Sequence, residues 1–296
     1  MRLAIEHETH YRFASPASHS IQYLRLTPRA DSSQSVLGWT VTAPGKVKRW
    51  VDGFGNFAHV AVQSGVHDDV SVMVRGEVET LDTCGMLPAD DGLPPLMFGR
   101  ATPYTEVTPA IAGFAEPYRE RIGDEGSIAA LHALMLGLHT TVAYRAGFTD
   151  VTTTASEALE AGLGVCQDHA HLFIACARVL GIPARYVSGY LYDPGEDPEG
   201  EATPGVASHA WAEAFIDEKV GWVSFDCANT RSATDAYVRL AVAFDYAGAA
   251  PIRGVRKGGG IEEMSVRVQV LHDSGQFQSQ GFNGQGQRQG QGQGPF

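Results

Sequence analysis

A cysteine stands where an apolar helix is predicted to begin, within residues 164–169, which read Gly-Val-Cys-Gln-Asp-His. Glycines at 162 and 164 predict a sharp bend just before it. The free peptide N–H groups and the positive dipole end of a helix N-terminus favour a thiolate. The same N–H groups can receive an oxyanion. Cys166 is therefore a candidate nucleophile, whereas Cys176, in the middle of the same helix, is predicted to be a small buried apolar residue.

A candidate base and a candidate carboxylate follow in two predicted strands. Residues 208–216 alternate between alanines on one face and larger side chains on the other, namely His209, Trp211, Glu213 and Phe215. After a turn at residues 217–221, a second strand ends at Asp226. A tight turn would pair His209 directly with Asp226, and a shift of one residue would put Asp226 on the opposite face. The sequence thus predicts a register in which any bulge keeps this parity.

Together these three residues make a nucleophile, a base and a carboxylate that orients the base. The competing hypothesis is a zinc site, because Cys166, His169, His171, His209 and Asp226 contain enough ligands. However, His169 and His171 lie two residues apart on a helix and face different directions. The sequence also lacks a Cys-x-x-Cys or His-Glu-x-x-His motif. We therefore predict no metal and no cofactor.

Composition restricts the partners. The 296 residues suffice for about two domains, and 22 Lys and Arg against 34 Asp and Glu give a formal charge of −12. An acidic protein repels phosphate backbones and anionic membranes, so we predict no nucleic-acid or membrane partner. The first residues contain no apolar core of a signal peptide, and no run of about eighteen apolar residues exists. With four cysteines that form no disulfide pattern, a cytoplasmic location is predicted.

The pattern of elements predicts an α+β protein with two domains. Residues 1–82 contain short alternating or β-branched stretches separated by turns, which indicates an N-terminal β-sandwich-like domain. Residues 83–110 are proline-rich and are predicted to be a linker. Residues 111–272 hold helices and then strands, and form the predicted catalytic core. The acidic stretch 193–205 is predicted to be a solvated loop, and the Gln/Gly-rich tail 273–296 to be disordered.

Around Cys166, His209 and Asp226 the sequence resembles the bacterial transglutaminase-like cysteine peptidase family. In the second half the resemblance lies in Gly-Val-Cys166-Gln-Asp168-His-Ala-His-Leu, in residues 180–190, in Ser-His209-Ala-Trp211-Ala-Glu213 and in Gly-Trp222-Val-Ser-Phe-Asp226. In the first half it lies in Leu26-Thr-Pro28-Arg29, Trp39 and residues 52–56. The resemblance covers about residues 1–272, and its several specific motifs occur in the family's order.

The resemblance implies a papain- or transglutaminase-like core in which a helix presents Cys166 to a sheet that carries His209 and Asp226. It implies acyl transfer on a peptide or protein substrate through an acyl-enzyme. Trp211 and Tyr190 would line the cleft, Tyr144 would shape the oxyanion site, and Asp168 would brace the helix start. Two departures affect the cleft wall and leave the triad intact: Cys227-Ala228 replaces Pro-Thr, and Ala243-Phe244-Asp245-Tyr246 replaces Gly-Arg-Asp-Tyr.

Three functions are compatible with this sequence. A peptidase or amidase would pass the acyl group to water, and a cross-linking enzyme would pass it to an amine. These two differ only in what enters the cleft after acylation. The third, from a different class, is a peptide-binding module on an inactive core. Because all three triad residues are present, we predict a cysteine peptidase or amidase.

Overall fold

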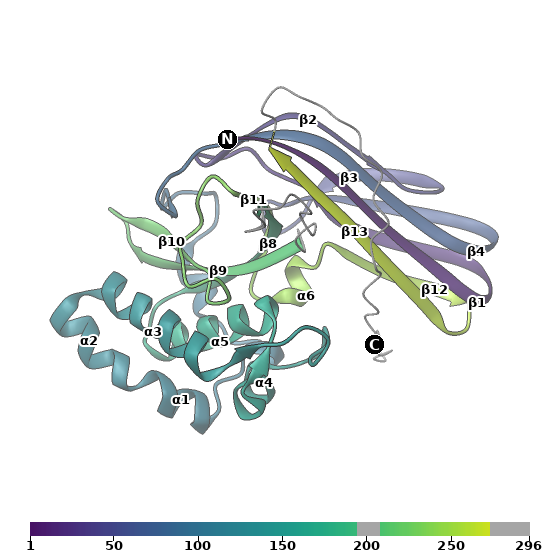
Figure 1. The fold of residues 1–296 in the computed structure, drawn as a ribbon. Helices are drawn as coiled ribbons and strands as arrows, with labels where there is room; N and C mark the ends of the chain where they lie inside the picture. Colours follow the sequence, from purple (N-terminus) through teal and green to yellow (C-terminus); the bar gives the residue numbers. More distant parts are fainter. Residues whose placement is uncertain (194–207, 273–296) are drawn as a thin grey trace, which may run out of the picture.

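The computed structural model describes residues 1–193 and 208–272 (Figure 1). The predicted acidic loop at 193–205, apart from Asp193, and the predicted disordered tail at 273–296 lie outside the described residues. The chain forms a long strand-rich blade that projects from a core of helices and strands (Figure 1). The α+β class predicted from the sequence is confirmed.

The blade is one six-stranded sheet built on two very long strands. β1 (Arg2–Thr27) and β4 (Phe57–Thr80) pair antiparallel along most of their length. The other strands are β2 (Gln34–Thr42), β3 (Lys46–Val51), β12 (Ile252–Gly258) and β13 (Glu262–His272). β2 and β3 pair with the two ends of β4, and β13 and β12 pair with the two halves of β1.

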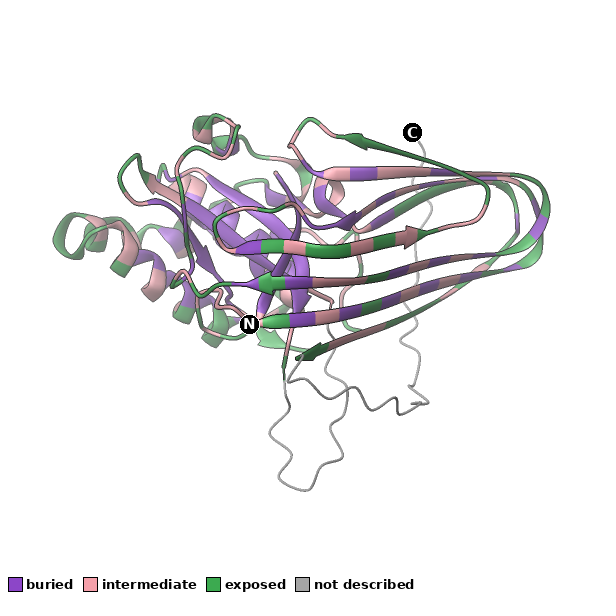
Figure 2. Ribbon diagram, turned by 90° about the horizontal axis from the view of Figure 1, so that it is seen from above, coloured by how far each residue is buried: buried purple, intermediate pink, exposed green. Residues whose placement is uncertain are grey.

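The sheet folds back on itself midway along its long strands, and Figure 2 shows the turn at the end far from the core. Buried positions of β1 are odd-numbered up to Phe13 and include Ser20, Gln22 and Leu24 after the irregular middle, where its register with β4 shifts. Trp39 of β2 pairs with Gly76 of β4, beside the N-terminal half of β1. Its indole N–H nevertheless donates to the carbonyl of Leu26, in the C-terminal half of β1, at 2.7 Å. The two halves thus form two layers around one apolar core, as a sandwich-like domain requires.

We call the two halves the first and the second layer. The first layer contains residues 2–13 of β1, residues 69–80 of β4, β2 and β13. The second layer contains residues 17–27 of β1, residues 57–64 of β4, β3 and β12.

The C-terminal strands β12 and β13 belong to this blade, which corrects the predicted domain boundary. We assigned residues 111–272 to the catalytic core, but residues 252–272 pair with β1. The outer edge of β1 would otherwise expose a row of unpaired N–H and C=O groups, and these strands cover it. A local sequence pattern identifies a strand without specifying a partner at the other end of the chain, so the boundary could not be placed from composition.

The core is built on a five-stranded antiparallel sheet in the order β11-β8-β9-β10-β5. These strands are β5 (Met86–Leu87), β8 (Ala184–Leu191), β9 (Ser208–Asp217), β10 (Gly221–Phe225) and β11 (Tyr237–Ala243). The predicted alternation of β9 is present, and Ala210, Ala212 and Ala214 lie in the apolar cluster that contains the side chains of α5 (Cys166–Val179). Their small side chains let the helix approach the sheet closely.

Helices cover one face of this sheet (Figure 1). They are α1 (Pro109–Ala115), α2 (Pro117–Glu125), α3 (Ser127–Thr141), α4 (Ala155–Ala161), α5 and the short α6 (Tyr246–Ala249), with 3-10 turns η1 (Pro95–Gly99) and η2 (Pro103–Thr105). Ser127 is the first residue of α3, and Gly126 occupies its N-cap position. Among the described residues, no helix combines the length and the apolar character needed to cross a membrane.

Two amide side chains of the blade bind the edge strand β11 of the core. The Asn56 amide accepts from the Val242 N–H at 2.9 Å and donates to the Val242 carbonyl at 2.8 Å. Gln34 makes the same pair of bonds with Arg239, both at 2.8 Å. Each amide therefore replaces a missing strand neighbour, which ties blade and core together.

Candidate active site

The structure places Cys166 at the first position of α5, with Val165 as the N-cap. Asp168, three residues past the cap, is fully buried and accepts from the Val165 N–H at 2.7 Å and from the Thr149 hydroxyl at 2.6 Å. It braces the helix start, in the role predicted for it. Gly164 is needed for this close arrangement, because a Cβ there would lie 2.8 Å from the Cβ of Asp168.

The approach to Cys166 is held by a short parallel pair, β6 (Ala143–Tyr144) with β7 (Leu163–Gly164). This pairing puts Tyr144 beside Gly164, two residues before the thiol. Its ring is about half exposed, and partial burial together with the nearby charges of Cys166 and Asp226 raises the pKa of Tyr144 to about 12. Tyr144 therefore lies near Cys166 with its hydroxyl protonated and able to donate a hydrogen bond.

His169 links the start of α5 to the segment that precedes β6. It is buried, and its ring nitrogens lie 3.0 Å from the Val165 carbonyl oxygen and 2.9 Å from the Val142 carbonyl oxygen. Through these two contacts His169 joins the cap of α5 to Val142, the residue before β6.

The predicted base and carboxylate are in direct contact. His209 Nε2 lies 2.6 Å from Asp226 Oδ2, and both side chains are almost fully buried. The direct pairing of His209 with Asp226 across β9 and β10 was wrong, because Phe225 pairs with Ala212, so Asp226 follows opposite Trp211. A bulge between Gly221 and Trp222 accommodates one extra residue of β9, and this one-residue shift puts Asp226 on the face predicted for it. Both side chains therefore share a face of the sheet.

Two residues that hold Asp226 were not identified from the sequence. The Asn229 amide donates to Asp226 Oδ2 at 2.7 Å and lies 3.3 Å from His209 Nε2. The Tyr237 hydroxyl donates to the same oxygen at 2.7 Å. Asn229 lies in the turn after β10 and Tyr237 begins β11, so no periodic pattern marks them. The one local signal that could have identified Asn229 is its spacing from Asp226, Asp-x-x-Asn at the end of a strand.

The surroundings of His209 favour its protonated form. Burial disfavours a charged imidazole, but hydrogen bonds with Asp226 and Cys166 outweigh it and raise the pKa of His209 to about 10. Burial also opposes ionisation of Asp226, but the His209, Asn229 and Tyr237 contacts keep the pKa of this carboxyl below its usual value. Because Nε2 faces Asp226, the remaining ring nitrogen Nδ1 is left for the thiol. Cys166 itself is only partly buried, as a nucleophile must be.

The ring of Trp211 packs against the ring of His209. It is 1% exposed, and its ring stacks beside His209 with centroids 6.2 Å apart and meets Tyr237 edge-on at 5.3 Å. Gly189 makes room for it, since a Cβ there would lie 2.6 Å from the indole. The expectation that Trp211 lines the cleft is therefore corrected: the ring is packed against the base and is not open to substrate.

Tyr190 also does not line the cleft. It is buried in the apolar core of the blade, and its hydroxyl lies 2.8 Å from His7 Nδ1 of β1. Tyr186 lies four residues earlier on the same face of β8 by alternation, yet it belongs to the apolar cluster shared with the helices, whereas Tyr190 belongs to the core of the blade. The sequence could not show where along β8 the blade meets the core.

Three other tyrosines lie around His171 of α5. Tyr186 packs on His171 with ring centroids 5.1 Å apart and on Tyr246 at 6.3 Å, and Tyr104 also packs on His171, at 5.3 Å. Burial, followed by the charge of Cys166, raises the pKa of Tyr186. Tyr246 is the tyrosine that this chain keeps from the Gly-Arg-Asp-Tyr pattern, and its backbone N–H donates to His171 Nε2 at 3.0 Å.

Neither buried cysteine is suited to act as a nucleophile, and the described residues offer no metal site. Cys176 and Cys227 are buried, and burial raises the pKa of Cys176 to about 12, in keeping with the apolar role predicted for Cys176. Over residues 1–193 and 208–272, no three His, Cys, Asp or Glu side chains come together in a way that could hold a metal ion. His169 and His171 point to different partners, as their spacing requires.

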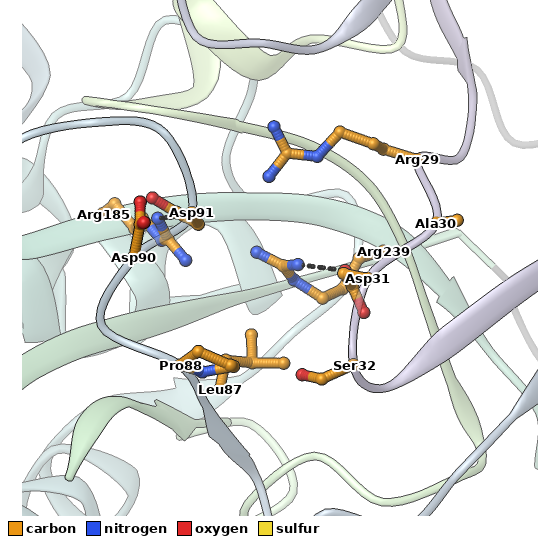
Figure 3. A pocket seen from close by; sticks show the side chains of 10 residues that line it. All are labelled: Arg29, Ala30, Asp31, Ser32, Leu87, Pro88, Asp90, Asp91, Arg185 and Arg239. Carbon is orange, nitrogen blue, oxygen red and sulfur yellow. Dashed lines mark hydrogen bonds and ion pairs between the residues drawn. The ribbon is translucent and has the colours of Figure 1, made fainter. Parts of the chain in front are cut away.

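A charged recess of about 300 Å³ lies away from the triad, at the junction of blade and core (Figure 3). Arg185 pairs there with Asp91 and with the buried Glu213, and Arg239 pairs with Asp31 and Glu213. None of the residues that line it belongs to the triad. The ion pairs join β8, β9 and β11 to the loops after β1 and β5, so this network is a structural joint.

Comparisons with known proteins agree with this arrangement. Residues 116–227 match the transglutaminase-like superfamily model, and residues 3–79 match the bacterial transglutaminase-like N-terminal region. An uncharacterised protein of Mycobacterium leprae is 29% identical over 91% of this chain and 98% of its own length. An uncharacterised protein of Mycobacterium tuberculosis is 30% identical over 86% of this chain and 87% of its own. A solved structure, a candidate cysteine protease from Cytophaga hutchinsonii, shares the fold with a TM-score of 0.71 at 21% identity, over 97% and 96% of the two chains.

Proposed function

Because the chain belongs to the transglutaminase-like superfamily, we propose that it is a cysteine peptidase or amidase in which Cys166, His209 and Asp226 form the catalytic triad. The superfamily makes it a papain-like cysteine enzyme in general terms. The single observation that carries the finer proposal is the 2.6 Å contact of His209 with Asp226, beside a thiol at the start of α5.

In the proposed reaction the Cys166 thiolate attacks the carbonyl carbon of an amide. The oxyanion that forms would be met by the N–H groups of Cys166 and Gln167, which have no partner among the described residues. The imidazolium of His209 gives its proton to the leaving amine, and a thioester is left on Cys166. Water then attacks the thioester, His209 takes its proton, and the acid and the free thiolate are released.

Transfer of the same acyl group to an amine is the alternative. It differs in the second step only, where an amine in place of water attacks the thioester. A glutamine-containing peptide with and without a dansylated primary amine separates the two outcomes. Release of free acid in the presence of the amine supports hydrolysis, and a stable dansyl adduct supports cross-linking.

The proposal is tested by the iodoacetamide labelling rate of each cysteine across pH, mapped by peptide mass, in the native protein and in His209→Ala. Cys84 is exposed and serves as the ordinary thiol, and buried Cys176 serves as the unreactive one. We expect Cys166 to label at least about tenfold faster than Cys84 at pH 6, because a helix N-terminus and a neighbouring imidazolium are the surroundings that activate a thiol. His209→Ala should remove this advantage.

If Cys166 labels no faster than Cys84 in either protein, the triad is not assembled and a non-catalytic peptide-binding module becomes the better description. The peptide or protein substrate, the cytoplasmic location and the lack of nucleic-acid and membrane partners stay predictions from the sequence.

A further inference from the structure

The second layer of the blade is positively charged in an otherwise acidic chain. Its paired segments are residues 17–27, 46–51, 57–64 and 252–258. They contain seven Lys and Arg residues and no Asp or Glu, whereas the whole chain has a formal charge of −12. The first layer has both signs and holds surface pairs such as Arg75 with Glu6. The charge excess is thus confined to one layer.

Strand register brings these cations onto one outer face. Arg253, Tyr23 and Lys48 follow one another in a row across the sheet, through Val60 of β4. Two residues further along, Lys46 occupies the corresponding place in the next row. The positions of β1 between these rows are buried in the sandwich core, so the rows face outward. Neighbouring strands are about 4.8 Å apart, so the row is some three strand spacings long.

Aromatic rings lie among the cations. Trp50 is half exposed and donates its indole N–H to the Tyr23 hydroxyl at 3.0 Å, with ring centroids 5.4 Å apart. Among the described residues, the lysines of this layer make no ion pair, whereas Arg25 is paired with Asp52. We define the basic face by Tyr23, Lys46, Lys48, Trp50, Arg253 and Lys257.

The basic face is connected with the surroundings of the nucleophile. β12 leaves α6 and enters the blade (Figure 1), and Arg253 Nη1 donates to the Ala247 carbonyl of α6 at 3.1 Å. Tyr246 at the start of α6 packs on Tyr186, and both belong to or border the apolar cluster against which Cys166 packs. Arg253 is thus the member of the basic face nearest in contacts to the nucleophile, and Tyr23 and Lys48 follow it across the sheet.

We propose that the basic face is a substrate-docking surface that binds an acidic segment of the polypeptide whose amide is attacked at Cys166. This inference rests on the proposed function and adds the substrate class to it. Unpaired lysines supply the charge complementarity, and Trp50 and Tyr23 supply apolar contact area for side chains between the acidic ones. A peptide is favoured over nucleic acid because a short acidic segment meets only the basic face, whereas a longer polyanion also meets the acidic remainder of the molecule.

The test uses an iodoacetyl group linked by a Gly-Ser spacer to ten glutamates, with ten serines or ten thymidylates as the matched probes. The alkylation rate of Cys166 by each probe is divided by its rate with plain iodoacetamide in the same protein. We expect the glutamate probe to exceed the serine probe about tenfold, because docking raises the effective concentration of the warhead. The Lys46→Glu/Lys48→Glu protein should lose this gain. Arg75→Glu/Arg267→Glu, an equal charge change on exposed arginines of the first layer, should keep it.

Anisotropy of fluorescein-labelled deca-glutamate with Cys166→Ala protein separates this inference from the proposed function. Binding that weakens at least about tenfold in the Lys46→Glu/Lys48→Glu background supports docking even if Cys166 proves unreactive with iodoacetamide, which would overturn the triad alone. Equal glutamate and serine rates with a fast Cys166 would overturn the docking surface and leave the triad standing. A thymidylate probe that matches or exceeds the glutamate probe would overturn the peptide as the partner.

Discussion

At the scale of single residues, the least expected feature is how completely one carboxylate oxygen is occupied. Asp226 Oδ2 receives hydrogen bonds from His209, Asn229 and Tyr237, and Oδ1 receives two backbone N–H groups of the turn that follows. A carboxylate bonded in this way stays ionised and cannot rotate. The base that it orients is therefore fixed before substrate arrives.

Asn229→Ala tests this role. We expect kcat of the acyl transfer to fall about tenfold with KM changed little, because His209 loses orientation and the substrate contacts are untouched. The free energy of unfolding should fall by about 1.5–3 kcal/mol for one lost hydrogen bond to a charged group. Asn229→Asp, which keeps the size but repels Asp226, should lower kcat further. An unchanged kcat in Asn229→Ala would show that Tyr237 alone holds the carboxylate.

The pH dependence of stability follows from the same group. A pKa of His209 raised from 6.5 to about 10 stabilises the fold fully below pH 6.5, and this contribution is lost as pH rises towards 10. The lowered pKa of Asp226 contributes above pH 3.8 and is lost on acidification. Urea unfolding of native and His209→Asn proteins should therefore differ more at pH 6 than at pH 10. The same difference at both values would argue against a charged His209.

At the scale of elements, the start of α5 depends on a close approach that only glycine permits. A Cβ at Gly164 would meet the Asp168 side chain at 2.8 Å. We expect Gly164→Ala to cost about 1–3 kcal/mol in unfolding free energy by overpacking, and to slow alkylation of Cys166 as the cap shifts. Gly123→Ala in α2 meets nothing within 4 Å and should be neutral or slightly stabilising. If both variants behave alike, the cap does not control the nucleophile.

At the scale of the whole molecule, the blade is completed by the far end of the chain. A protein that ends at Ala250 lacks β12 and β13, which cover one edge of β1 in both layers. We expect this truncation to lose cooperative thermal unfolding and to aggregate, because the exposed edge invites intermolecular strand pairing. A truncation at His272 removes only residues outside the described part and serves as the control. A folded, monomeric 1–250 protein would show that the blade does not need β12 and β13.

The sequence alone was sufficient for the features that a few neighbouring residues determine. The helix from Cys166, the alternation of β9 and the brace by Asp168 all follow from local patterns of apolar spacing, capping and turn residues. Cys166, His209 and Asp226 could be named because each stands at the end of such an element. The parity of the His209–Asp226 register was inferred from the triad itself, since side chains alternate along a strand and only one parity puts both residues on one face.

Only the tertiary structure decided which elements meet. It placed Tyr190 in the blade and Trp211 behind His209, brought Asn229 and Tyr237 to Asp226, and paired β12 and β13 with β1. It also gathered Lys46, Lys48 and Arg253, which no basic run in the sequence announces, onto one face. The physical reason is that strand pairing joins segments of any sequence separation through backbone groups that every residue shares, so local side-chain patterns do not specify the partner.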